Sequence, residues 1–176
     1  MQRFILTGAP GAGKTTIVRQ LAGQDCKTVA EAATDIIARE QAAGVAEPWT
    51  AAGFVAKIAQ LQKQRIAAAT GWIQCHDRSP ICTLALARHL GVPVPPILER
   101  LLDRIATQRL FEPSVFIVDS LDFIEKTAAR RIDLEEARAF GRLHAQAYAE
   151  LGYRLVSVPA GPVATRVEQV RAHFVA

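Results

Sequence analysis

The sequence contains no asparagine among its 176 residues. Regulatory GTPases read guanine with an Asn-Lys-x-Asp motif, and protein kinases hold a metal ion with an asparagine of the catalytic loop. Because neither feature can exist without asparagine, both classes of protein are excluded. The lack of asparagine does not decide whether a nucleotide-binding protein of another class would use ATP or GTP.

Cysteine is scarce, and its spacing matches no metal or redox motif. Cys26, Cys75 and Cys82 form neither a C-x-x-C pair nor a zinc-type pattern, which indicates a reducing compartment. No apolar run approaches the length of a membrane span. The first residues already belong to a functional segment that cleavage of a leader would remove. We therefore expect a soluble, cytoplasmic protein without a membrane span.

Long runs of lysine or arginine are also missing, although the formal net charge is +4 and the pI is near 9.3. We therefore expect no nucleic-acid partner. A bound polyphosphate, or a surface that happens to be basic, explains the charge equally well. Half of the residues are hydrophobic, which suits one full core. With no linker, internal repeat or low-complexity tract, residues 1–176 are expected to form a single domain.

Strand-like and helix-like segments alternate along the chain, as they do in α/β proteins. Thr50 is expected to cap a long helix, Pro80 to open another, and Asp133 with Glu136 to form a capping box. The pattern predicts a three-layer α/β fold with a central five-stranded parallel sheet and helices on both faces. The expected strands are residues 3–7, 27–30, 72–75, 114–118 and 153–158. The expected helices are one that includes residues 17–21 and stops at Gly23, then 31–41, 50–69, 80–90, 97–108, 133–151 and a last one beyond 162.

The first expected strand runs directly into a glycine-rich segment and then into an amphipathic helix. This is the P-loop pattern G-x-x-x-x-G-K-T in its proper context. Its glycines let backbone N–H groups approach a polyanion, and the helix N-terminus adds further N–H groups. We predict that Lys14 reaches the β- and γ-phosphates of a nucleoside triphosphate and that the Thr15 hydroxyl ligates Mg²⁺. The predicted phosphate-binding residues are Gly8, Ala9, Pro10, Gly11, Ala12, Gly13, Lys14, Thr15 and Thr16.

Ligands of open parallel sheets bind at the carboxyl ends of the strands, so polar residues that follow the third strand are candidates. Asp77 is predicted to meet the Mg²⁺ held by Thr15, and its alternative role is to cap the helix that begins near Pro80. Arg78 is predicted to face the transferring phosphate or its acceptor. The alternative for Arg78 is a pairing with a surface carboxylate.

The second and fourth strands end in further candidates. Glu31 would act as a general base toward an acceptor hydroxyl, or would merely be a favourable acid in the first turn of a helix. Arg130 and Arg131 would close over the nucleotide as a lid and neutralise the transferring phosphoryl group; the alternative is a solvated helix end. Asp119 and Asp122 would assist the metal ion or remain solvated loop residues.

The aromatic and imidazole side chains carry less information. The Trp49 and Trp72 rings are expected in the core or in a pocket wall, and His76 is interpreted as a packing residue at a strand end. No ligand spacing is present among the other histidines, which are His89, His144 and His173.

The P-loop, the helix after Glu31, the Pro48-Trp49 turn, the Asp77-Arg78-Ser79 strand end and the late segment LGYRLVSVPAGPV together resemble the NadR-like P-loop ATPases of the AAA-domain type. These proteins are related to nucleoside and nucleotide kinases, including the ribosylnicotinamide kinase domain of the bacterial NAD regulator. The resemblance implies a kinase-like fold with an arginine-bearing lid. In related deoxynucleoside kinases a Glu after the second strand is the base and a Glu-Arg-Ser motif follows the third strand; here Asp replaces that Glu.

The leading hypothesis is an ATP-dependent phosphotransferase that transfers the γ-phosphate, with Mg²⁺, to a small acceptor of the nucleoside or nucleotide type. Its catalytic residues would be Lys14, Glu31, Arg78 and the two lid arginines. The alternative is a nucleotide-dependent binding module, or a slow ATPase or GTPase, without a small-molecule acceptor. A ring-forming AAA+ ATPase is disfavoured because the chain has no room for a second helical domain. The sequence leaves the acceptor, GTP against ATP, and the oligomeric state open.

Overall fold

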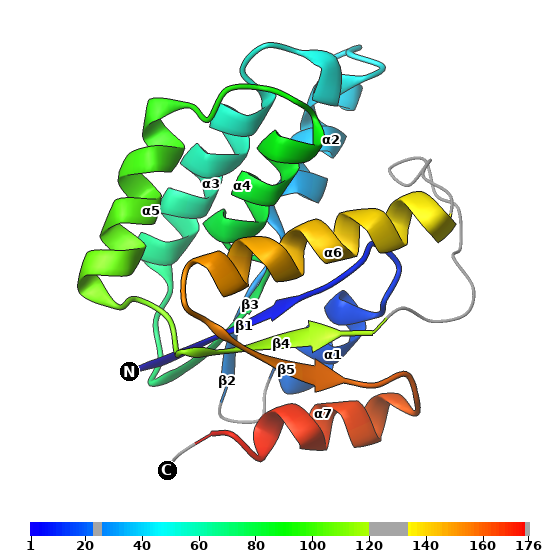
Figure 1. The fold of residues 1–176 in the computed structure, drawn as a ribbon, viewed down its shortest axis with the longest axis vertical. Coiled ribbons are helices and arrows are strands. Elements are labelled where there is room, and N and C mark those ends of the chain that lie inside the picture. The colour runs from blue at the N-terminus through cyan, green and yellow to red at the C-terminus, as the bar shows by residue number, and fades with distance from the viewer. Residues whose placement is uncertain (23–25, 120–133, 175–176) are drawn as a thin grey trace.

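The computed structural model describes residues 1–22, 26–119 and 134–174, without the side chains of residues 134 and 136–138. Its strands form a parallel sheet in the order β2-β3-β1-β4-β5 (Figure 1). Parallel neighbours require crossover connections, and the helices between the strands supply them. The strands are β1 (Gln2–Thr7), β2 (Cys26–Val29), β3 (Ile73–Asp77), β4 (Ser114–Val118) and β5 (Arg154–Val158).

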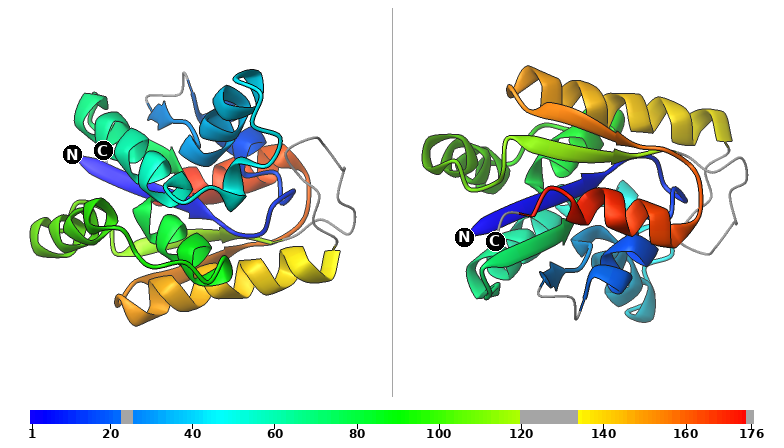
Figure 2. Two further views of the ribbon diagram at one scale, coloured as in Figure 1. Left: turned by 90° about the horizontal axis from the view of Figure 1, so that it is seen from above. Right: turned by 90° about the horizontal axis from the view of Figure 1, so that it is seen from below.

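Helices cover both faces of this sheet, which confirms the predicted three-layer α/β fold. Helices α1 (Lys14–Leu21) and α7 (Val163–Arg171) pack on one face (Figures 1 and 2). The opposite face is covered by α3 (Phe54–Ala68), α4 (Pro80–His89), α5 (Pro96–Gln108) and α6 (Leu134–Glu150). The short helix η1 (Pro48–Thr50) and α2 (Ala32–Ala42) pack against α3 at one side. No described helix is long and apolar enough to cross a membrane.

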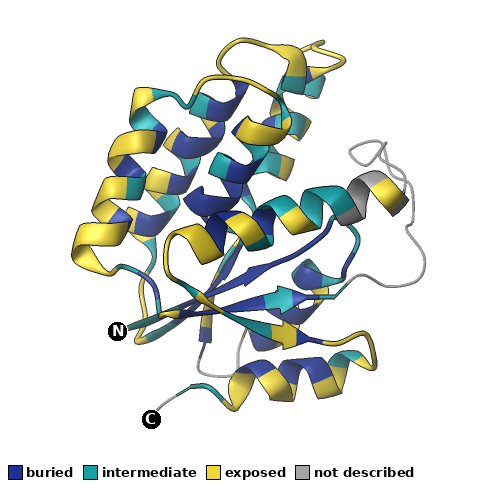
Figure 3. Ribbon diagram, viewed as in Figure 1, coloured by how far each residue is buried: buried dark blue, intermediate teal, exposed yellow. Residues whose placement is uncertain are grey.

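Strand β1 lies at the centre of the sheet, and its side chains alternate between the two apolar layers. Phe4 and Leu6 pack with the residues of α1 and α7, whereas Ile5 packs with those of α3 to α6. A central parallel strand is buried on both faces, so a continuous apolar run is expected there. Figure 3 shows the buried residues concentrated in the strands and on the inner sides of the helices.

Strand β3 is longer than the sequence pattern predicts, because it continues through two polar residues. His76 and Asp77 pair with Ile5 and Leu6 of β1 and are 2% exposed each. Pairing with the central strand satisfies their backbone groups, so the polar side chains do not end the strand. The His76 ring meets the Phe111 ring edge-on, which agrees with the packing role predicted for it.

Two local expectations are wrong. Thr50 does not cap α3; its hydroxyl donates to the Glu47 carbonyl at 2.8 Å and closes η1, and Gly53 is the residue before the helix. The Trp72 ring lies neither in the core nor in a pocket wall, since it is 67% exposed. The capping box of Asp133 and Glu136 lies outside the described side chains.

Candidate functional site

The P-loop connects β1 to α1, and its glycines Gly8, Gly11 and Gly13 all have positive φ. Gly8 has φ +127°, and a Cβ there would lie 2.4 Å from the Val118 carbonyl oxygen. Any side chain would therefore push the loop off the end of β4. Gly13, with φ +85°, precedes the first residue of α1. Gly13 has no side chain to cap α1, so the N–H groups at the start of this helix remain available. Uncapped N–H groups at a helix N-terminus bind phosphate in other proteins.

Lys14 lies back over the loop with only 5% of its surface exposed. Its Nζ donates to the carbonyl oxygens of Gly8 at 3.2 Å and Ala9 at 2.7 Å. Burial and the positive charge of Arg78 lower the pKa of Lys14 to about 7, against the opposing effect of Glu31. A cation held at low solvation beside a glycine-rich loop is well placed to attract a polyanion.

Thr15 and Asp77 meet, as the sequence analysis expected. The Thr15 hydroxyl donates to Asp77 Oδ2 at 2.6 Å. The second carboxylate oxygen, Oδ1, is buried without a hydrogen-bond partner among the described residues. Burial, assisted by Glu31, raises the pKa of Asp77. The alternative role as a helix cap is wrong, because the Ser79 hydroxyl caps α4 by accepting from the N–H of Ile81 at 3.2 Å.

This pair fits a magnesium ion by its chemistry. A carboxylate and a hydroxyl are hard oxygen donors, and an unpartnered buried carboxylate oxygen is a group that a cation would satisfy. Within the described ranges, no three His, Cys, Asp or Glu side chains gather as a metal cage. Mg²⁺ is commonly held by one or two protein oxygens together with water and substrate phosphates, so a small donor set is sufficient.

Arg78 connects the end of β3 to two other elements. Its backbone has φ +70°, a left-handed conformation that is costly for a residue other than glycine. Its Nε lies 2.6 Å from Glu31 Oε1, and its Nη1 lies 2.8 Å from His144 Nε2. Although burial acts in the opposite direction, the carboxylate of Glu31 raises the pKa of Arg78. The strained backbone thus holds a permanent cation at the centre of the site.

Glu31 stands between β2 and α2, opposite the P-loop. Its second oxygen, Oε2, accepts a hydrogen bond from the Thr34 hydroxyl at 3.0 Å. Burial works to raise the pKa of Glu31, but Arg78 and Lys14 together with the Thr34 bond lower it overall. Glu31 is therefore ionised at neutral pH, and each of its oxygens retains a lone pair for a further hydrogen bond. A crevice lined by Ala30, Gln62 and Arg78 lies beside it.

Helix α6 contributes residues that the sequence analysis did not select. His144 is 1% exposed, and its Nδ1 lies 2.7 Å from the Phe140 carbonyl. Because a carbonyl only accepts, Nδ1 carries the proton and Nε2 accepts from Arg78. Four residues later, the Tyr148 hydroxyl lies 2.6 Å from Ser79 Oγ. The sequence signal was the i, i+4 spacing of two large polar rings, which places them on one face of a helix.

Substitution of His144 by glutamine is expected to flatten the pH dependence of stability. Burial and the charge of Arg78 hold the pKa of His144 well below its ordinary value, so below about pH 6.5 the unfolded chain takes up a proton that the folded protein refuses. Stability therefore falls as the pH drops below about 6.5, by up to about 1.4 kcal/mol per pH unit for one such group. Urea unfolding at about pH 7.5 and about pH 5.5 measures the difference.

The matched control for this experiment is His173→Gln, since the His173 ring packs against Phe116 on the other face of the sheet, away from His144. Glutamine at position 144 retains an acceptor oxygen for Arg78, so the native contact survives without a titrating group. An unchanged pH dependence in His144→Gln would contradict a buried neutral imidazole at this position.

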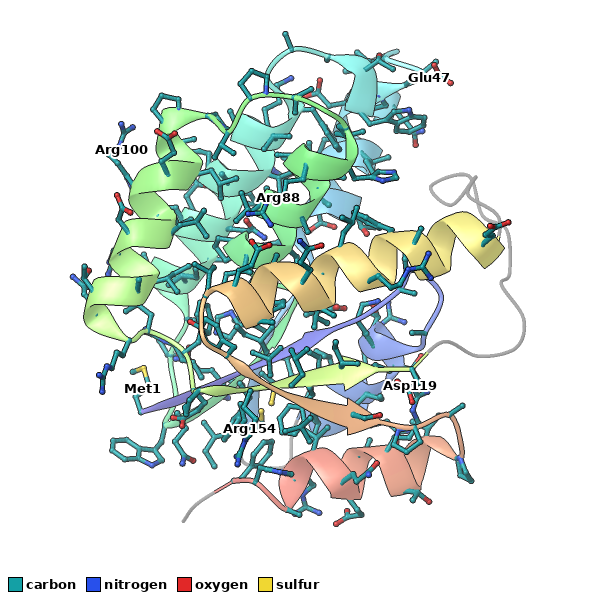
Figure 4. All side chains as sticks on the ribbon, viewed as in Figure 1. Met1, Glu47, Arg88, Arg100, Asp119 and Arg154 are labelled. Atoms are coloured by element: carbon teal, nitrogen blue, oxygen red, sulfur yellow. The ribbon has the colours of Figure 1, made fainter. Side chains whose placement is uncertain are left out.

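The structure thus brings together Lys14, Thr15, Glu31, Asp77 and Arg78 at the carboxyl ends of β1, β2 and β3. In Figure 4 this end of the sheet is the one at which Asp119, after β4, is labelled, and Met1 is labelled at the opposite end. Arg130 and Arg131, which were predicted to form a lid, lie outside the described residues, as does Asp122. Sequence reasoning missed His144, Tyr148 and Arg166.

Comparison with known structures supports the fold. Two solved structures of deoxyadenosine kinase from M. mycoides resemble the chain over almost its full length. One, with bound dATP, has a TM-score of 0.63 at 16% identity and covers 98% of each chain. The other, with the products dCMP and a flexible dCDP bound, has a TM-score of 0.56 at 13% identity and covers 97% of each. At these identities the likeness concerns the fold.

A search of curated protein sequences finds no match. A family model described as an AAA domain matches residues 3–166, which include the P-loop and all of the sheet except Gln2 at the start of β1. The chain therefore belongs to this AAA domain family of P-loop proteins.

Proposed function

We propose that the protein is an ATP-dependent phosphotransferase whose acceptor is a nucleoside or nucleotide. The observation that carries the proposal is the ion pair of Glu31 and Arg78, 2.6 Å apart, beside the P-loop. A binding module needs the loop and a metal site alone. Glu31 and Arg78 are additional groups. The Glu31 carboxylate would accept the proton of an acceptor hydroxyl, and the Arg78 guanidinium would stabilise the transferring phosphoryl group.

Each residue has a separate role in this proposal. The amides of residues 8–16 and the ammonium of Lys14 hold the triphosphate. Thr15 and Asp77 would hold Mg²⁺, which when bound neutralises phosphate charge. Arg78 stabilises the charge of the transferring group, and the lid residues Arg130 and Arg131 are proposed to assist it. GTP in place of ATP remains compatible with the site.

The proposed transfer exchanges one phosphorus–oxygen bond for another. The oxygen of the acceptor hydroxyl forms a bond to the γ-phosphorus, and the bond from that phosphorus to the β–γ bridging oxygen breaks. The proton of the hydroxyl passes to the ionised carboxylate of Glu31, and ADP leaves with the electron pair. His144 and Glu31 both contact the Arg78 guanidinium, so this group is already held in place before the reaction begins.

The kinase proposal predicts transfer of a labelled phosphate to an acceptor. The purified protein is incubated with Mg²⁺ and γ-labelled ATP or GTP, with each of the common nucleosides, deoxynucleosides and their monophosphates in turn. Because the two similar structures are those of a deoxyadenosine kinase, deoxyadenosine and deoxycytidine are the first acceptors to test. Label on an acceptor is the expected result. Label found in inorganic phosphate alone, with every acceptor, would favour a slow NTPase or binding module instead.

A further inference from the structure

Arg166 is a buried arginine that reaches the P-loop from the last helix. It lies in the first turn of α7 and is 3% exposed. Its Nη2 donates to the carbonyl oxygen of Ala12 at 2.8 Å, and a longer contact of 3.4 Å reaches the carbonyl oxygen of Asp119. A Cβ built on Gly13 would lie 3.1 Å from Nη1. The guanidinium therefore contacts the two residues that immediately precede Lys14.

The charge of Arg166 has no carboxylate partner at ion-pair distance in the described part of the chain. Its two described acceptors are main-chain carbonyls, and its Nε has no hydrogen-bond partner among the described residues. Burial lowers the pKa of Arg166, and the charge of Asp119 opposes this only in part. Burying a cation without a close ion-pair partner is costly, so stability of the fold is a poor reason for an arginine at this position. A polyanion bound on the loop would supply a further counter-charge.

The hydrogen bond to Ala12 also has a geometric consequence. A peptide unit is planar and trans, so its C=O and the following N–H point in opposite directions. When Arg166 holds the Ala12 carbonyl, the N–H of Gly13 must point away from α7. Rotation of this peptide would bring the N–H of Gly13 toward a guanidinium, which has no acceptor to offer it.

We propose that Arg166 is a positioning residue for the P-loop: it holds the Ala12 carbonyl so that the Gly13 N–H faces the bound phosphates. The inference rests on the proposed function only in requiring that the loop binds polyphosphate. It assigns α7, which lies on the same face of the sheet as α1 (Figure 2), a part in nucleotide affinity.

The test compares Arg166→Met with Arg171→Met, a matched change of an exposed arginine on the same helix. Tripolyphosphate with Mg²⁺ displaces a fluorescent ADP analogue, mant-ADP, from the full chain. We expect Arg166→Met to bind both probes about tenfold more weakly or worse, since a charge-assisted hydrogen bond is lost. Arg171→Met should match the wild-type protein. Arg166→Lys, which retains a charged donor, should recover part of the affinity.

A second readout separates positioning from support of the fold. In the wild-type protein the amide NMR signal of Gly13 should shift when tripolyphosphate is added, and in folded Arg166→Met this shift should be lost. Wild-type affinity and a wild-type Gly13 shift in Arg166→Met would overturn the inference. If Arg166→Met does not fold, Arg166→Lys and Arg166→Gln are judged by the same two measurements. No acceptor is present in this assay, so its outcome is independent of whether phosphoryl transfer is found.

Discussion

Replacement of Lys14 by alanine is expected to reduce turnover of ATP by about a hundredfold to a thousandfold or more. We propose that the Lys14 ammonium contacts the β- and γ-phosphates; its Nζ donates to the carbonyls of Gly8 and Ala9 in the P-loop. Removing it takes away charge stabilisation that grows as the phosphoryl group transfers. The measurement is ADP formation with and without an acceptor, together with the affinity for mant-ADP.

Loss of activity in this variant should not result from loss of the fold. Burial lowers the pKa of Lys14 to about 7, so the native state stabilises its charged form poorly, and removing the side chain costs chiefly the two hydrogen bonds to Gly8 and Ala9, about 1 kcal/mol each. Thermal unfolding of Lys14→Ala should therefore show a cooperative transition only modestly below that of the wild-type protein. Lys63→Ala, at an exposed position of α3, is the control. Turnover by Lys14→Ala at the rate of this control would show that the P-loop is not the site of catalysis.

Much of the site could be predicted because its residues follow from two rules that act on local sequence. The P-loop pattern identifies Lys14 and Thr15 directly, and the carboxyl ends of parallel strands must share one edge of the sheet. Glu31 and Asp77 were predicted at the ends of two strand-forming segments. Both were therefore expected beside the loop, although they are distant from it in sequence. The 2.6 Å contacts of Thr15 with Asp77 and of Arg78 with Glu31 agree with that reasoning.

The remaining contacts depend on how helices pack, which no local pattern specifies. His144 reaches Arg78 because α6 lies directly on the P-loop, where a Cβ on Gly141 would be 3.4 Å from the Cβ of Ala9. Arg166 reaches Ala12 because α7 packs beside α1. The end of β3 was predicted wrongly for a similar reason. The polar residues His76 and Asp77 were expected to lie beyond the strand, but pairing with β1 buries them within the sheet.

Substitution of Glu31 by glutamine is expected to slow phosphoryl transfer by about a hundredfold to ten-thousandfold, the usual contribution of a general base. Glutamine has nearly the same shape and keeps an oxygen beside Arg78, but it cannot take up the proton of the acceptor hydroxyl. The affinity for mant-ADP should stay within about twofold of the wild-type value, because the proposed triphosphate site does not include Glu31. Single-turnover transfer from γ-labelled ATP measures the effect.

The same substitution distinguishes two roles that the geometry of Glu31 allows. The carboxylate is ionised and can accept a proton, but it also lies 2.6 Å from Arg78 and could act only by orienting that cation. If orientation is its sole role, Glu31→Gln should transfer phosphate almost normally, since the amide oxygen still holds Arg78. Glu40→Gln supplies the control, because Glu40 lies on α2, the helix that begins directly after Glu31, and is also paired, with Lys57. Full transfer activity in Glu31→Gln would therefore remove the assignment of this residue as the base while leaving the phosphate site intact.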